Sequence, residues 1–211
     1  RGAGVGVVIT ASHNPAHWNG FKYKPDYGGS ASQAVIDDLE RHIADASTSD
    51  RVRRVPLDEA ERQGLLEYVD PETPYLGHIA TLVDLDAIRR AGLKVVVDSM
   101  FGAGAGYLAK LLDGGTTKVT ELHAEPDPTF PGIAQPEPIA LNLKTLLSAV
   151  PGQDADVGLA TDGDADRLGV VDETGRFMTT LQTFALLCLH QLEVLGNRGP
   201  LVRSITMTSM I

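Results

Sequence analysis

The feature that most constrains the fold is the alternation of short apolar runs with helical stretches after residue 94. Strands are predicted at residues 95–98, 119–122 and 157–161, and helices at residues 107–112 and 141–150. Strands that alternate with helices in this way are typical of a parallel sheet and not of an all-β sandwich or a helical bundle. The sequence therefore predicts an α/β fold in which mixed, mostly parallel sheets are sandwiched by helices.

The segments before and after this region carry patterns of their own. A strand is predicted at residues 4–10, and a helix that Ser32 caps follows it. Apolar residues recur at every fourth position of this helix, which indicates a face turned to a core: Val35, Leu39 and Ile43. Pro71 and Pro74 mark a linker between two domains. A hairpin turn at residues 173–175 is followed by a predicted helix at 181–195 and a strand at 202–210.

Charge and cysteine content narrow the class of protein. The 211 residues include 18 Lys and Arg against 28 Asp and Glu, which gives a net charge of −10. A chain this acidic is not drawn to nucleic acid or to an anionic membrane surface, so neither is expected as a partner. Cys188 is the only cysteine, which excludes an intrachain disulfide and favours a reducing compartment, the cytoplasm. The longest apolar runs are far shorter than the roughly 20 residues that a membrane helix needs.

Three carboxylates lie at alternate positions directly after the predicted strand 157–161. They are Asp162, Asp164 and Asp166, in the run Asp-Gly-Asp-Ala-Asp-Arg. Because such close carboxylates repel one another, a hard divalent cation with oxygen ligands is the expected partner. A calcium EF-hand is the competing interpretation, since Glu173 stands at its twelfth position. However, Arg167 replaces the glycine required at position six, and the flanking residues predict strands instead of helices.

Ser12 and His13 lie in a loop after the first predicted strand. A serine hydrolase is disfavoured, because Ser12 is not in a Gly-x-Ser-x-Gly turn and an adjacent histidine is poorly placed to act as its base. Positive charge for a phosphate ester is offered by Lys22, Lys24 and Arg167. The loop could otherwise be a simple turn that the serine caps.

Glycines at 102, 104 and 106, with Glu121 near the end of the next strand, imitate a dinucleotide-binding fingerprint. The third glycine of that fingerprint would fall at position 107, which is Tyr107. A tight turn between strand and helix is the preferred interpretation. An NAD-dependent oxidoreductase stays a distant alternative, as does a calcium-binding module.

Three motifs occur together and in order along the chain: Thr10-Ala11-Ser12-His13-Asn14-Pro15, Asn19-Gly20-Phe21-Lys22 and Asp162-Gly163-Asp164-Ala165-Asp166-Arg167. In this combination the chain resembles the α-D-phosphohexomutase superfamily, the phosphoglucomutase and phosphomannomutase family. The resemblance implies an isomerase that moves a phosphoryl group between C1 and C6 of a hexose phosphate. The reaction would pass through a phosphoserine and a bisphosphorylated sugar.

The resemblance also implies roles for individual residues. Ser12 matches the phosphoserine, which would complete a site for one Mg²⁺ with Asp162, Asp164 and Asp166. Lys22 matches the acid/base group, and His13 is counted with it as catalytic. Phosphate contacts are expected from Arg167, Asn14 and Lys24. Small-molecule hexose phosphates would be the partners, and a hexose 1,6-bisphosphate the activator.

The family's enzymes have four domains, and the chain matches only part of such an enzyme. Residues 1–69 resemble the end of domain I with the phosphoserine loop, residues 70–175 domain II with the metal loop, and residues 176–211 the start of domain III. A fragment of this kind is expected to be inactive alone. Thr10-Ala11 and residues 28–31 favour a phosphoglucomutase, with phosphomannomutase and phosphoglucosamine mutase as alternatives. Ala165 replaces a glycine that is frequent in the metal loop.

Overall fold

The computed structural model describes residues 2–49 and 52–204. Contacts divide these residues into two units. The first unit contains residues up to 10 and residues 19–79, and the second contains residues 11–18 and the residues from 80 onward. Residues 11–18, which include Ser12, are therefore grouped with the later part of the chain and not with their sequence neighbours.

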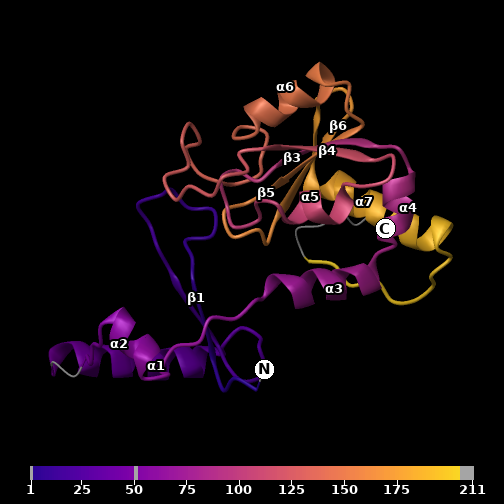
Figure 1. Cartoon of the computed structure of the whole chain (residues 1–211). Coiled ribbons are helices and arrows are strands. Elements are labelled where there is room, and N and C mark those ends of the chain that lie inside the picture. Colours follow the sequence, from indigo (N-terminus) through magenta and orange to yellow (C-terminus); the bar gives the residue numbers. More distant parts are fainter. Residues whose placement is uncertain (1, 50–51, 205–211) are drawn as a thin grey trace. The chain divides into compact units, whose positions relative to one another are not determined.

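The first unit contains a two-stranded antiparallel sheet and helices (Figure 1). Strand β1 (Gly6–Ile9) pairs with β2 (Phe21–Lys24), and helices α1 (Gln33–Thr48) and α2 (Leu57–Arg62) follow. Helix α3 (Glu72–Leu82) runs across the boundary between the two units.

The predicted α1 is present, but two details of the prediction are wrong. Ser32 occupies the N-cap position without a side-chain capping hydrogen bond. The apolar face with Val35 and Ile43 is exposed, and none of the helix's described residues is buried. Among the described residues of the first unit, Ala60 is the only buried apolar residue. A two-stranded sheet offers too small a face to cover a helix of 16 residues.

The second unit is built on a five-stranded sheet in the order β4-β3-β5-β6-β7. Strand β3 pairs in parallel with β4 and β5, whereas β5-β6 and β6-β7 are antiparallel pairs. The predicted mixed α/β architecture is therefore confirmed, with equal numbers of parallel and antiparallel pairs in this sheet. The strands are β3 (Lys94–Asp98), β4 (Lys118–Leu122), β5 (Val157–Thr161), β6 (Leu168–Asp172) and β7 (Phe177–Met178).

Helices cover both faces of this sheet (Figure 1). Helix α6 (Lys144–Gly152) lies on one face, and α4 (Leu85–Arg90) and α5 (Tyr107–Leu112) lie on the other. The core between α6 and the sheet is a cluster of buried apolar residues: Val96, Met100, Leu143, Leu146, Val150, Ala155, Ala160 and Val171. Gly158 permits this packing, because a Cβ added there would lie 2.6 Å from a methyl group of Val150.

The last described elements differ in part from the predictions. The hairpin turn at residues 173–175 is confirmed between β6 and β7. The single helix predicted at 181–195 is α7 (Thr180–Leu189), which starts with a capping box of Thr179 and Gln182, followed by the π-helix η1 (His190–Val194). Residues 202–204 are not a strand, and the rest of the strand predicted there lies outside the described residues. No helix in the described part of the chain has both the length and the apolar character that membrane crossing requires.

Candidate active site

Three loops of the second unit meet at one edge of the sheet. Because β3, β4 and β5 are parallel, the loops that follow them leave the same edge. We call them the glycine loop (residues 99–106, after β3), the proline-rich loop (residues 125–138, after β4) and the aspartate loop (residues 162–167, after β5). A fourth segment of the same unit, the serine loop (residues 11–18), carries Ser12 and His13.

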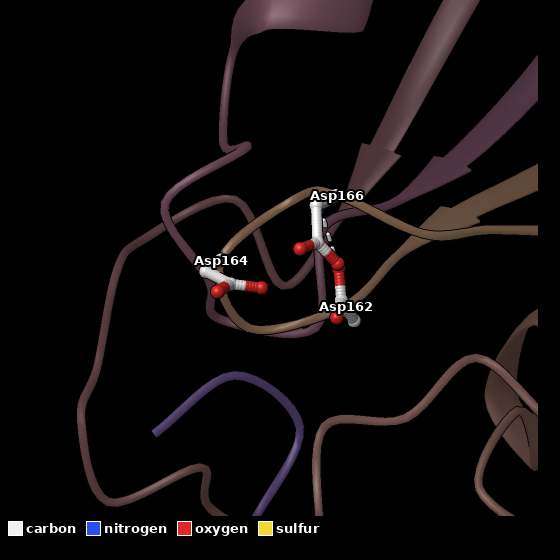
Figure 2. A group of neighbouring side chains, drawn as sticks. All are labelled: Asp162, Asp164 and Asp166. Atoms are coloured by element: carbon white, nitrogen blue, oxygen red, sulfur yellow. Dashed lines mark hydrogen bonds between the residues drawn. The ribbon is translucent and has the colours of Figure 1, made fainter. Parts of the chain in front are cut away.

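The aspartate loop gathers the three predicted ligands. Asp162, Asp164 and Asp166 each offer a carboxylate oxygen, and these oxygens all lie within 4.8 Å of one another. Figure 2 shows the three side chains turned towards a common point. Asp162 is fully buried, Asp164 is half-buried and Asp166 is exposed, so the group opens towards solvent on one side. The predicted clustering of the three aspartates is confirmed.

Among the described residues, hydrogen bonds reach only one of the two carboxylate oxygens of Asp162. Its Oδ1 accepts hydrogen bonds from the backbone N–H groups of Asp166 at 2.9 Å and Arg167 at 3.0 Å. Its Oδ2 is buried, and no hydrogen-bond partner exists for it among the described residues. Burial raises the pKa of Asp162 above its ordinary value, and the charges of Asp164 and Asp166 raise it further. A hard divalent cation fits this donor set, because it would bind the buried oxygen and offset the repulsion.

The structure excludes an EF-hand. The aspartate loop joins two antiparallel strands, β5 and β6, where an EF-hand would have helices. Glu173 follows β6 and lies in the hairpin at the other end of that strand. It therefore cannot complete a site with Asp162.

The glycine loop packs closely against the aspartate loop. A Cβ added at Gly102 would lie 2.8 Å from the backbone oxygen of Gly163, and one added at Gly104 would lie 2.8 Å from Oγ1 of Thr161. The N–H of Ala103 donates to the oxygen of Gly163 at 3.0 Å. The glycines therefore let two backbones approach each other closely, a role that the sequence analysis did not assign to them.

The same contacts argue against a dinucleotide site. The carboxylate of Glu121, which would bind a ribose, accepts hydrogen bonds from Oγ of Ser99 at 2.5 Å and from the N–H of Gly106 at 2.8 Å. The N–H groups of Gly102, Ala103 and Ala105 are bonded to other carbonyl groups of the protein. A dinucleotide site would need these N–H groups to bind the pyrophosphate and the carboxylate to bind the ribose, but all of them are hydrogen-bonded within the protein.

The serine loop packs against the aspartate loop. A Cβ added at Gly163 would lie 2.5 Å from the backbone oxygen of Ser12 and 3.0 Å from Cγ of Pro136. Gly163 is thus the point where the serine, proline-rich and aspartate loops converge. Only a residue without a side chain fits there.

Ser12 is half-buried and has a left-handed backbone, with φ of 56°. Its Oγ lies 3.2 Å from Nδ1 of His13. The two adjacent side chains are therefore within hydrogen-bond distance of each other, and whether His13 acts as a base for Ser12 stays a prediction. Asn14 closes the same turn, since its Nδ2 donates to the oxygen of Ala11 at 2.9 Å.

Glu137 of the proline-rich loop was missed by sequence reasoning. Its Oε1 accepts a hydrogen bond from Nη1 of Arg167 at 3.2 Å, across 30 residues of sequence. No local sequence motif predicts a pair of residues so far apart. The only signal in the sequence is the run of prolines, which indicates that residues 125–138 form an ordered loop. Lys22 and Lys24 lie on β2 of the first unit, opposite Val8 and Gly6, and their predicted roles stay predictions.

Comparisons with known proteins agree with this geometry. Residues 73–175 match the family description "Phosphoglucomutase/phosphomannomutase, alpha/beta/alpha domain II", and residues 1–50 match "alpha/beta/alpha domain I" of the same family. A probable phosphoglucosamine mutase of Methanopyrus kandleri is 37% identical over 95% of this chain, and a phosphoglucomutase/phosphomannomutase of Thermococcus kodakarensis is 37% identical over 98%. The chain covers 41% and 43% of the lengths of these relatives.

A solved structure has the same architecture. The phosphoglucomutase/phosphomannomutase family protein of Burkholderia thailandensis aligns with a TM-score of 0.65 and 29% identity, over 88% of this chain and 38% of that protein. The two domain matches, the similarity of sequence and structure, and the aspartate loop in its expected place lead to one conclusion. The chain belongs to the phosphoglucomutase/phosphomannomutase family of α-D-phosphohexomutases.

Proposed function

We propose that the protein containing this chain is a phosphohexomutase in which Ser12 carries the phosphoryl group. The observation that best supports this proposal is the packing of the serine loop on the aspartate loop at Gly163. That contact brings a hydroxyl-bearing residue next to a group of carboxylates suited to a divalent cation. Phosphoryl transfer depends mainly on positioning and on charge neutralisation, and these are what such an arrangement provides.

The cation that we propose is one Mg²⁺, held by Asp162, Asp164 and Asp166 together with an oxygen of phosphorylated Ser12. When bound, it would neutralise charge on the transferring phosphoryl group. Phosphoserine and three carboxylates together carry about five negative charges. Arg167, whose side chain is 44% exposed, would bind phosphate from the same edge of the sheet.

Ser12, His13 and Lys22 are the proposed catalytic residues. In one direction the bond between phosphorus and Oγ of Ser12 breaks while a bond from a sugar hydroxyl oxygen to phosphorus forms. The proton of that hydroxyl passes to a base, for which Lys22 is the candidate, and Oγ of Ser12 is left in reach of the His13 ring at 3.2 Å. The second phosphate of the sugar bisphosphate returns to Ser12 in the reverse sense. Asn14 shapes the turn, and Lys24 adds positive charge.

Glucose phosphates are the proposed substrates, with glucose 1,6-bisphosphate as the activator. Mannose and glucosamine phosphates are the alternatives, and relatives that are similar to this chain carry the names of all these mutases. The chain covers less than half the length of those relatives, so the contacts that select the sugar belong in part to other segments. We further propose a cytoplasmic enzyme.

Replacement of Ser12 tests this proposal. In the complete protein, Ser12→Ala should lower the conversion of glucose 1-phosphate to glucose 6-phosphate roughly a thousandfold or more, because the phosphoryl carrier is lost. Ser30→Ala, at an exposed serine of the first unit, is the matched control and should leave the rate unchanged. A Ser12→Ala protein with activity within tenfold of the unaltered protein would contradict the assignment.

A further inference from the structure

The side chain of Glu137 is fixed from several directions. One carboxylate oxygen, Oε1, accepts a hydrogen bond from Nη1 of Arg167 at 3.2 Å, and the other, Oε2, accepts one from Nε2 of Gln135 at 2.9 Å. The backbone oxygen of Glu137 accepts a hydrogen bond from the Asn142 side chain at 3.0 Å. The side chain is 24% exposed, so solvent screens its charge only in part. Glu137 thus presents a carboxylate of fixed direction to Arg167.

Arg167 has two other carboxylates within reach. Its Nε lies 3.9 Å from Oδ2 of Asp162 and 4.0 Å from Oδ1 of Asp166. These distances are at the limit of an ion pair, whereas the bond to Glu137 is a direct hydrogen bond. Both aspartates belong to the group that offers oxygens to a cation. An arginine that moved fully onto them would compete with that cation for the same oxygens.

We propose that Glu137 is a positioning residue that holds the Arg167 guanidinium away from the aspartates of the cation site. This inference rests on the proposed function, in which the aspartates bind Mg²⁺ and Arg167 binds phosphate. By binding the guanidinium, Glu137 keeps the carboxylate oxygens of Asp162 and Asp166 available to the metal. The guanidinium then stays available to bind a phosphate. Its effect on the metal is therefore exerted through Arg167 and not by direct ligation.

The test is a double-mutant cycle on metal affinity, measured on the 211-residue chain by calorimetric titration with Mn²⁺. Glu137→Gln keeps the size of the side chain but removes its charge. We expect it to weaken Mn²⁺ binding roughly tenfold, the scale typical of residues that orient a metal site from outside. In the Arg167→Met background the same substitution should change the affinity less than twofold, because there is no guanidinium left to release.

Two simpler roles for Glu137 would give a different result. If Glu137 acted only as a nearby negative charge, or only by stabilising the proline-rich loop, Glu137→Gln would weaken binding by the same factor in both backgrounds, and the inference would be overturned. Glu173→Gln makes the same charge change at an exposed site beyond β6 and should alter affinity less than twofold. If the unaltered chain bound no Mn²⁺, the metal site of the proposed function would fail along with this role. An equal loss in both backgrounds, with normal binding by the unaltered chain, would reject the role of Glu137 alone.

Discussion

Each end of β6 has an aspartate next to a hairpin loop, and the two aspartates differ in how fully their carboxylates are hydrogen-bonded. Asp172, the last residue of β6, accepts four hydrogen bonds from the loop that follows, two from Thr174 and two from Arg176, at 2.6–3.1 Å. In the aspartate loop before β6, Asp162 accepts two backbone hydrogen bonds on one oxygen, and its other oxygen is buried without such a bond among the described residues. One aspartate is fully satisfied by its own turn, and the other is not.

The electrostatics of the two carboxylates differ accordingly. Hydrogen bonds from Thr174 and Arg176 lower the pKa of Asp172 to about 2. Burial and neighbouring carboxylates raise the pKa of Asp162. A satisfied carboxylate stabilises the fold by itself, whereas an unsatisfied buried one destabilises the fold unless a partner arrives. The hydrogen-bond partners of the two carboxylates thus distinguish a structural aspartate from a candidate metal ligand, although the residue type is the same.

Exchange of each aspartate for asparagine should give the largest difference between the two loops. In the complete protein, Asp162→Asn should reduce mutase activity roughly a thousandfold, because a metal ligand and its charge are lost. Asp172→Asn should leave activity within about twofold. Steady-state rates at saturating Mg²⁺ provide the measurement. Similar losses in both variants would show that the two loops do not differ in this way.

Each loop also has a glycine with no room for a side chain. A Cβ at Gly163 would meet the Ser12 oxygen, and one at Gly175 would meet the oxygen of Leu147. We expect Gly163→Ala and Gly175→Ala each to lower the free energy of unfolding by about 1–3 kcal/mol, as overpacking does. Gly152→Ala, where a Cβ would meet no atom within 4 Å, is the control for urea denaturation. Only Gly163→Ala should also weaken Mg²⁺ binding; an equal weakening in Gly175→Ala would contradict this difference between the loops.

The left-handed residues of the two loops give a smaller test. Ala165 has φ of 61° in the aspartate loop, and Gly175 has φ of 80° in the other hairpin. Ala165→Gly should relieve backbone strain of about 1–2 kcal/mol, offset in part by about 0.4–1 kcal/mol of added freedom in the unfolded chain. The net gain in stability should be measurable by thermal unfolding. A less stable variant would indicate that the Cβ of Ala165 contributes packing that exceeds its strain.

The lowered pKa of Asp172 predicts the smallest effect, one limited to acid. Because the folded state favours the charged form, Asp172 stabilises the fold above its ordinary pKa of 3.8, and this contribution is lost as pH falls towards about 2. Between about pH 4 and pH 2 the unaltered chain should therefore lose more stability than Asp172→Asn. Urea midpoints at several pH values would measure this. Parallel curves for the two proteins would count against the stabilising role of the hydrogen bonds to Asp172.

The strands of the second unit could be predicted from sequence because their patterns are local. The apolar runs before Asp98 and before Asp162 become β3 and β5, and residues 107–112 become α5 as predicted. The clustering of the three aspartates was also predictable, since it follows from their spacing in one loop. The exposed face of α1 was not, because burial depends on which surface the rest of a unit offers.

The supporting parts of the site depend on contacts between distant segments, and for that reason the sequence did not reveal them. Gly102 and Gly104 imitate a nucleotide loop in sequence but face Gly163 and Thr161 across more than 50 residues of chain. Glu137 meets Arg167 in the same way, by the convergence of loops from neighbouring strands. The short distance between Oγ of Ser12 and the His13 ring goes with the left-handed φ of Ser12, and residue identity alone does not specify that angle.

Titration with Mg²⁺ tests the central claim most directly, on the 211-residue chain shown by intact mass to carry one phosphate on Ser12. Calorimetry should find one Mg²⁺ per chain for the unaltered protein and for Asp172→Asn, and none for Asp162→Asn. At a hundredfold excess over Kd, Mg²⁺ should add about 2.7 kcal/mol to the stability of the first two proteins and nothing to that of the third. Equal binding and equal stabilisation in Asp162→Asn would contradict the claim that the aspartate loop holds the metal.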